Sequence, residues 1–174
     1  MKAKLTLVML VLVGASVVGV CGDGAVVKDT SMADPRLARL LKEKGTRYMV
    51  DDVGDYLVRG ESWVSNQVRS VWINSRTQQW GGTEIRQIWS VAYTVAGHIS
   101  LEDAKNFLER NSLIKIGAWQ IVEHRDSYSV IFSAKVDANQ TASSLDDMIT
   151  FVLVTADGVA LQVSRGKLLP PGGG

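Results

Sequence analysis

The chain has 174 residues, of which 46% are hydrophobic and 21% charged, with 19 basic and 18 acidic side chains. This near-neutral balance, with no basic patch or stripe, argues against a nucleic-acid-binding protein. With Cys21 as its one cysteine, the mature chain can form neither an internal disulfide nor a thiolate metal cluster. The length suits a single domain, whose stability must come from a packed core.

Residues 1–21 have the pattern of an export signal. Lys2 and Lys4 precede an uncharged apolar run, Leu5–Val20, which ends at Cys21. We therefore expect an exported protein, periplasmic or secreted. Three outcomes stay open: cleavage that releases a soluble protein, lipoprotein processing that leaves Cys21 as the lipidated first residue, or retention as an anchor near the shortest length that spans a bilayer. Membrane contact is expected only through this segment or a lipid.

Residues 22–33 are small and polar without periodicity, which is typical of a linker. The folded domain is predicted from 34 to 164, and residues 165–174 form a tail that we expect to be disordered. Asp34 and Pro35 suit the cap and first position of a helix, and Gly45 provides its stop.

Strand patterns follow this first helix. Residues 46–50 and 56–59 predict a hairpin, and further strands are predicted at 67–75 and 84–95, with a loop at 78–82. Side chains that alternate with period two, joined by glycine-bearing connections, favour an antiparallel sheet. Three tryptophans on alternating strands are expected in the core: Trp72, Trp89 and Trp119.

A second helix is predicted from a capping box formed by Ser100 and Asp103. Its buried stripe is expected to consist of Leu101, Ala104, Phe107 and Leu108. A second hairpin, 116–124 with 128–136, turns across Arg125-Asp126-Ser127.

The last segment allows two interpretations. A helix starting near Ser144, with Asp146 and Asp147 in its first turn, fits the helix dipole. The β-branched run before Asp157-Gly158 also suits a hairpin turning at those two residues. With the helix, the fold class is α+β: a single antiparallel sheet of about five strands with three helices, in the order α-β-β-β-(β)-α-β-β-α.

Residues 35–163 resemble the YbjN family of bacterial sensory transduction regulators. The motifs that carry the resemblance include Asp52-Val53-Gly54-Asp55-Tyr56 and, more specifically, Asn111 followed by Ile116-Gly117-Ala118-Trp119. The family's fold is similar to that of the small dimeric chaperones of type III secretion. Because the family has no established catalytic residues, the resemblance implies a protein that is not an enzyme.

Residues with catalytic or metal-binding potential are sparse. His98 and His124 are the only histidines, and neither has a second histidine at helical spacing. Asp51, Asp52 and Asp55 lack the alternating ligands of a calcium loop, so a hairpin turn explains them better. No serine stands in a nucleophile elbow. We expect no catalytic residue, metal or cofactor; a hydrolase or metal enzyme using His98 or His124 is the less favoured alternative.

The expected activity is binding to another protein, in a regulatory or chaperone-like role. Trp63 and Trp80 lie in predicted loops and are candidate partner contacts. Phe151 and Val154 lie on a last helix that is apolar around its circumference, and they are candidates for a homodimer interface. The binding surface is expected to combine the exposed sheet face with this helix. A structural envelope lipoprotein tethered through Cys21 is a further alternative.

Overall fold

A computed structural model describes residues 32–165 of the chain. The predicted signal, Cys21, nearly all of the linker and most of the tail lie outside the described residues. The elements are α1 (Pro35–Glu43), β1 (Tyr48–Val50), β2 (Tyr56–Glu61), β3 (Val68–Trp80), β4 (Thr83–Ala96), α2 (Leu101–Asn111), β5 (Ala118–Glu123), β6 (Ser127–Asp137) and α3 (Ala142–Ser164). The predicted α+β class and element order are confirmed, with six strands in the sheet.

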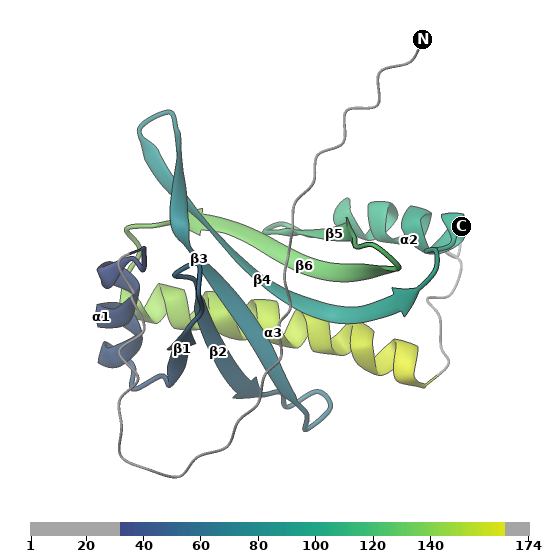
Figure 1. Cartoon of the computed structure of the whole chain (residues 1–174), viewed down its shortest axis with the longest axis horizontal. Helices are drawn as coiled ribbons and strands as arrows, with labels where there is room; N and C mark the ends of the chain where they lie inside the picture. Colours follow the sequence, from purple (N-terminus) through teal and green to yellow (C-terminus); the bar gives the residue numbers. More distant parts are fainter. Residues whose placement is uncertain (1–31, 166–174) are drawn as a thin grey trace.

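The strands form one antiparallel sheet in the order β1-β2-β3-β4-β6-β5 (Figure 1). α3 lies across one face and contacts β3, β4 and β6, α1 packs against α3, and α2 packs against β5. Val71, Ile88 and Phe132 point to this covered face and are fully buried. Within residues 32–165, no helix lies on the opposite face.

Both predicted helix starts are confirmed. The Asp34 carboxylate accepts a hydrogen bond from the Arg36 N–H at 2.9 Å, and Gly45 takes a φ of +69° just after α1. The Ser100 hydroxyl accepts from the Asp103 N–H at 3.0 Å. The predicted buried stripe of α2 is wrong in part, because Leu101 and Leu108 are exposed. Since α2 packs over the edge strand β5 and not over the middle of the sheet, only a narrow stripe around Phe107 is covered.

The last segment is one continuous helix, so the hairpin alternative is wrong. α3 begins at Ala142, earlier than predicted, because the Thr141 hydroxyl caps the Ser144 N–H at 3.2 Å. Asp157 and Gly158 lie inside the helix. Within the described part of the chain, α3 is also the one helix long and apolar enough to cross a membrane, a criterion that central helices of soluble cores meet too. Its inner residues, such as Val152 and Ala156, are fully buried against the sheet.

The predicted loop at 78–82 is wrong. β3 continues to Trp80, which pairs with Thr83 across a tight turn of Gly81-Gly82. Gly81 has a φ of +58°, which glycine adopts without steric cost. Cross-strand pairing from Thr77 onward extends the two strands into a hairpin arm that projects beyond the rest of the sheet (Figure 1).

In β4 the covered side includes polar residues, although the covered face of the sheet as a whole is apolar. In β4 the buried residues are Arg86, Ile88, Ser90 and Ala92, whereas Trp89 points to the helix-free face. The expectation that Trp72 and Trp89 lie in the core is therefore wrong: both are half-buried on that outer face. The expectation for Trp119 is confirmed, since it packs between Phe107 and Phe132.

The motif of Asn111 and Ile-Gly-Ala-Trp joins α2 to β5. The Asn111 side-chain oxygen accepts from the Trp119 N–H at 2.7 Å, and its amide donates to the Trp119 carbonyl at 3.2 Å. Gly117 has a φ of +87°, and a Cβ there would lie 2.8 Å from the Phe132 ring. The asparagine and the glycine are thus required by geometry.

Candidate functional site

The helix-free side of β3 and β4 carries three of the five tryptophans; we call Trp72, Trp80 and Trp89 the tryptophan face. The Trp72 and Trp89 rings stack with centroids 4.6 Å apart and planes 9° apart. The Trp89 N–H donates to the Asn74 side-chain oxygen at 3.0 Å, which fixes its ring. The centre of this face is therefore a flat and pre-ordered aromatic surface.

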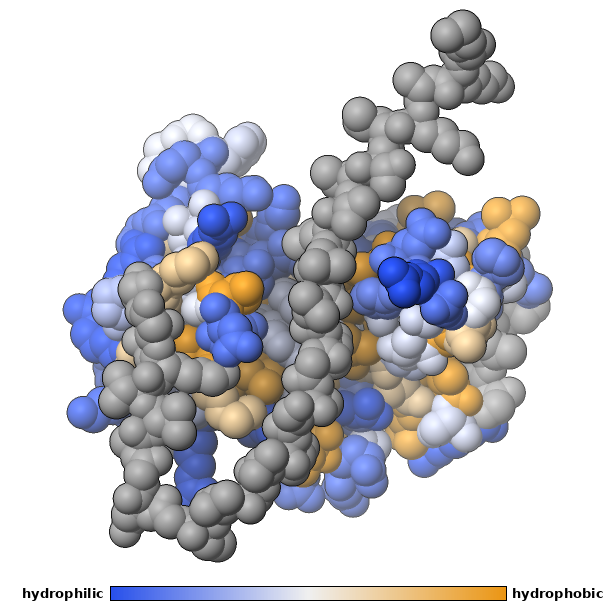
Figure 2. Space-filling model, viewed as in Figure 1, coloured by the Kyte–Doolittle hydropathy of each residue, from blue (hydrophilic) through white to orange (hydrophobic). Residues whose placement is uncertain are grey.

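Trp80 lies on the same face, at the tip of the hairpin arm. Its exposed fraction is 76%, although a tryptophan gains about 3 kcal/mol from burial. Gln79 pairs with Glu84, whose side chain bonds Arg36 of α1, so both side chains point toward α1. Trp80 follows Gln79 in the strand and therefore points to the opposite side, which is the helix-free one. On the side shown in Figure 2, the arm is hydrophilic to neutral, whereas hydrophobic surface gathers over the body of the sheet.

Trp63 is also exposed, at 69%, in the loop between β2 and β3. The base of this loop is held by Asp157 of α3, which is fully buried. The Asp157 carboxylate accepts from the Ser65 hydroxyl at 2.8 Å and from Arg69 Nε at 2.6 Å. Trp63 and Trp80, the two candidate partner contacts, are thus both exposed, and their role in binding stays a prediction.

Asp157 stays ionised in this setting. Burial raises the pKa of its carboxyl group, but hydrogen bonds from Ser62, Ser65 and Arg69, with the charge of Arg69, outweigh burial and lower the pKa below its ordinary value. Asp157 therefore acts as an anionic anchor that ties the Trp63 loop to the centre of α3.

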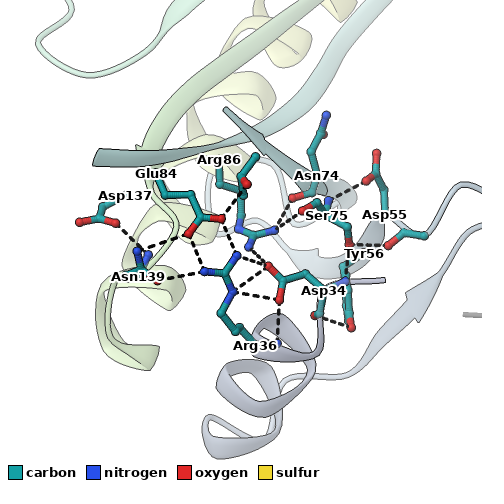
Figure 3. Close-up of polar contacts among 12 residues, drawn as sticks. Asp34, Arg36, Asp55, Tyr56, Asn74, Ser75, Glu84, Arg86, Asp137 and Asn139 are labelled. Atoms are coloured by element: carbon teal, nitrogen blue, oxygen red, sulfur yellow. Dashed lines mark hydrogen bonds and ion pairs between the residues drawn. The ribbon is translucent and has the colours of Figure 1, made fainter. Parts of the chain in front are cut away.

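A second polar cluster joins α1 to β3 and β4 (Figure 3). Arg36 and Arg86 both bond the Asp34 carboxylate, and Arg36 also bonds Glu84 at 2.7 Å. Arg86 is almost fully buried and donates to the backbone carbonyls of Asn74 and Ser75.

The carboxylates of this cluster are strongly acidic. Burial of Asp34 opposes ionisation, yet the bonds from Arg36 and Arg86 bring its pKa down to about 2. Bonds from Arg36 and Thr77 likewise lower the pKa of Glu84 to about 2. Because these acids are saturated with donors, the cluster fixes the fold and offers no free acid or base.

The two histidines have different surroundings in the structure. Among residues 32–165 no group of three or more His, Cys, Asp or Glu side chains is placed to hold a metal ion. His98 is exposed and lines a shallow cavity of about 210 Å³. His124 Nε2 lies 3.0 Å from the Ser129 hydroxyl, which in turn contacts the Thr94 hydroxyl at 2.9 Å.

The outer side of α3 borders a groove. Phe151 is 38% exposed, and Val154 is half-buried. The groove, of about 350 Å³, lies between α3 and the end of α2. It is lined by Arg110, Leu113, Ile114, Trp119, Val154, Thr155, Gly158, Val159 and Gln162. Because α3 covers one face of the sheet and the tryptophans occupy the other, the expected single surface combining them is wrong. The dimer through Phe151 and Val154 stays a prediction.

Comparisons with known proteins add one result. No protein-family model matches the sequence. No curated protein matches it either. Among solved structures, the chain is similar to the crystal structure of "YbjN, a putative transcription regulator from E. coli", with 9% identity and a TM-score of 0.48, over 79% of this chain and 94% of that one. This match agrees with the resemblance expected from the sequence, and it concerns the fold alone.

Sequence reasoning missed three features: the Asp157 anchor, the buried Arg86 and the groove beside Arg110. A charged residue inside an otherwise apolar helix was a signal for the first. The other two depend on which face of the sheet is covered, which no local pattern reveals.

Proposed function

We propose that this domain is a non-enzymatic protein-binding module that engages its partner through the tryptophan face. The observation that carries the proposal is the exposure of Trp80 at the tip of a paired hairpin. Tryptophan is enriched among the residues that dominate binding energies at interfaces, above all where its ring is already held in place. The stacked Trp72 and Trp89 supply a flat surface on the same side of the strands, at the root of the arm and six residues of β4 from its tip.

Trp80→Ala is expected to weaken partner binding by about 2 kcal/mol, roughly thirtyfold, with no loss of stability. The reason is that the exposed ring contributes to an interface without supporting the core. The measurement is quantitative mass spectrometry of proteins captured from a native extract by the full chain and by the variant, with melting curves of both.

The matched control is Thr83→Ala, which alters the cross-strand neighbour of Trp80 while keeping the ring. A partner should be retained by this control and lost with Trp80→Ala. Equal capture by both variants would remove Trp80 from the interface, and dependence on Trp63→Ala alone would move the interface to the other loop.

The contact of His124 with Ser129 is the one observation that favours a hydrolase as the second candidate. A serine within hydrogen-bond reach of a histidine has the first two members of a nucleophilic triad. Within the described residues, however, no third group orients the other nitrogen of His124, and Ser129 is nearly buried. Neither residue lines either of the two cavities described above.

We therefore expect Ser129→Ala and His124→Ala to hydrolyse p-nitrophenyl butyrate no more slowly than the wild-type chain, with all three at the buffer rate. His98→Ala and His124→Ala should also leave metal content unchanged. Turnover by the wild type that disappears in both Ser129→Ala and His124→Ala would establish the hydrolase instead.

We also propose that the protein acts outside the cytoplasm, on the ground of the pattern in residues 1–21. Intact-mass measurement of cell fractions is expected to find a species shorter than 174 residues in the envelope or periplasm. A mass gain on Cys21 would favour the tethered lipoprotein. A full-length cytoplasmic species would contradict export.

A further inference from the structure

The groove beside α3 has an apolar floor and one charged wall. Ile114, Trp119, Val154 and Val159 supply the apolar surface, from the loop after α2, from β5 and from α3. Its volume of about 350 Å³ falls at the lower end of the range of small-molecule sites. The groove lies on the helix-covered side of the sheet, away from the tryptophan face.

The charged wall is Arg110, at the end of α2. Its guanidinium donates to the Gln162 side-chain oxygen at 3.4 Å, and no carboxylate among residues 32–165 pairs with it. Burial lowers the pKa of Arg110 below its ordinary value, with no acid nearby to offset the cost. A partly desolvated cation without a counter-charge beside an apolar groove is complementary to an apolar molecule that carries an anion.

Gly158 widens the same groove. It lies in the interior of α3, where glycine is less favourable than alanine by about 1 kcal/mol. Nothing lies within 4 Å of the position that a Cβ would occupy, so packing within the described domain does not require a glycine here. The missing side chain leaves open space in the wall of the groove, which is an observation independent of Arg110.

We propose that this groove binds a small carboxylate with an apolar chain, of the fatty-acid class. The chain lies over Trp119 and Val159 beside Gly158, and the carboxylate accepts hydrogen bonds from the Arg110 guanidinium. The bidentate geometry of arginine suits a carboxylate. This site is separate from the proposed protein-binding face, so either can fail without the other.

The test uses the full chain and three probes of equal length: decanoate, decan-1-ol and decylamine. Binding is followed by calorimetry and by NMR shifts of the Trp119 indole N–H and the Gly158 amide. Decanoate is expected to bind at least about tenfold more tightly than decan-1-ol, because a hydrogen bond to a charged group adds to the apolar contact. Decylamine is expected to bind least. No binding of decanoate, equal binding of decanoate and decan-1-ol, or shifts that spare Trp119 would overturn the proposal.

Two substitutions test the charge of Arg110 and the open space at Gly158 separately. Arg110→Gln should reduce decanoate affinity to that of decan-1-ol, whereas Arg125→Gln, the same change at an exposed arginine of the β5–β6 turn, should not. Gly158→Leu should fill the groove and abolish binding of both probes, while Gly158→Ala should retain it. If Gly158→Leu does not fold, Arg110→Gln still decides the outcome. Unchanged decanoate binding in Arg110→Gln would refute the site.

Discussion

Replacing Asp157 with alanine is expected to lower the free energy of unfolding by about 3 kcal/mol, as loss of one partner from a buried ion pair does. Arg69 and the Ser65 hydroxyl would lose their acceptor beneath the Trp63 loop. Urea unfolding followed by circular dichroism measures the change. Amide hydrogen exchange at Asn66 and Gln67 should accelerate as well, because that carboxylate anchors their loop.

Asp147→Ala is the matched control, since it removes an exposed carboxylate from the same helix and should change stability by no more than about 0.5 kcal/mol. The pKa of Asp157 is lowered in the folded state, so its contribution is present above the unfolded pKa, near 4, and is lost as the pH falls below it. The difference in free energy of unfolding between the wild type and Asp157→Ala should therefore become smaller in acid. Equal free energies of unfolding for the two proteins at neutral pH would show that Asp157 does not anchor the loop.

Arg86→Leu is expected to cost about 3 kcal/mol, which corresponds to a fall in melting temperature of roughly 10 °C. Arg86 is almost fully buried, and its loss would leave the carbonyls of Asn74 and Ser75 without their donor and Asp34 with Arg36 alone. Differential scanning calorimetry measures the change. Arg76→Leu, at an exposed arginine of the neighbouring strand β3, is the control and should be nearly neutral.

The same cluster gives a titration test. The pKa of Asp34 falls from its ordinary 3.8 to about 2, which corresponds to about 2 kcal/mol of stability that is present above pH 4 and lost as the pH falls toward 2. In Arg86→Leu the pKa of Asp34 should move back toward 3.8, since one of its two cationic partners is gone. An NMR titration that finds the same Asp34 pKa in both proteins would contradict the assigned pairing.

Local chemistry predicted the helices from the sequence, because caps and stops act over a few residues. Asp34, Gly45 and Ser100 were readable in this way. Alternation in β4 also showed which residues share a face as far as Val91, beyond which a register shift turns Tyr93 toward Phe107. It did not show which face α3 covers, so Trp89 was assigned to the core while Arg86, the residue buried there, was overlooked.

Of the candidate site, the sequence singled out only the two exposed tryptophans. Trp63 and Trp80 stood out as large aromatic residues beside glycine or polar neighbours, and both are exposed. Asp157-Gly158 also suited a hairpin turn, since this pair of residues is common in turns. In the structure the aspartate lies inside a helix, where Arg69, 88 residues away, stabilises it. Such a pairing is fixed by tertiary structure, and no pattern within a few residues encodes it.

The Asn111 side chain occupies the N–H and carbonyl of Trp119, near the start of the edge strand β5. At the opposite edge, β1 offers three residues. Exposed edges are where sheets recruit strands from other molecules and begin to aggregate. A partner that added a strand to this sheet would therefore meet the occupied backbone of Trp119 at the β5 edge and a strand of only three residues at the β1 edge. Changing Asn111 to alanine would free the N–H and carbonyl of Trp119 and so lengthen the stretch of β5 backbone that is available for pairing with another chain.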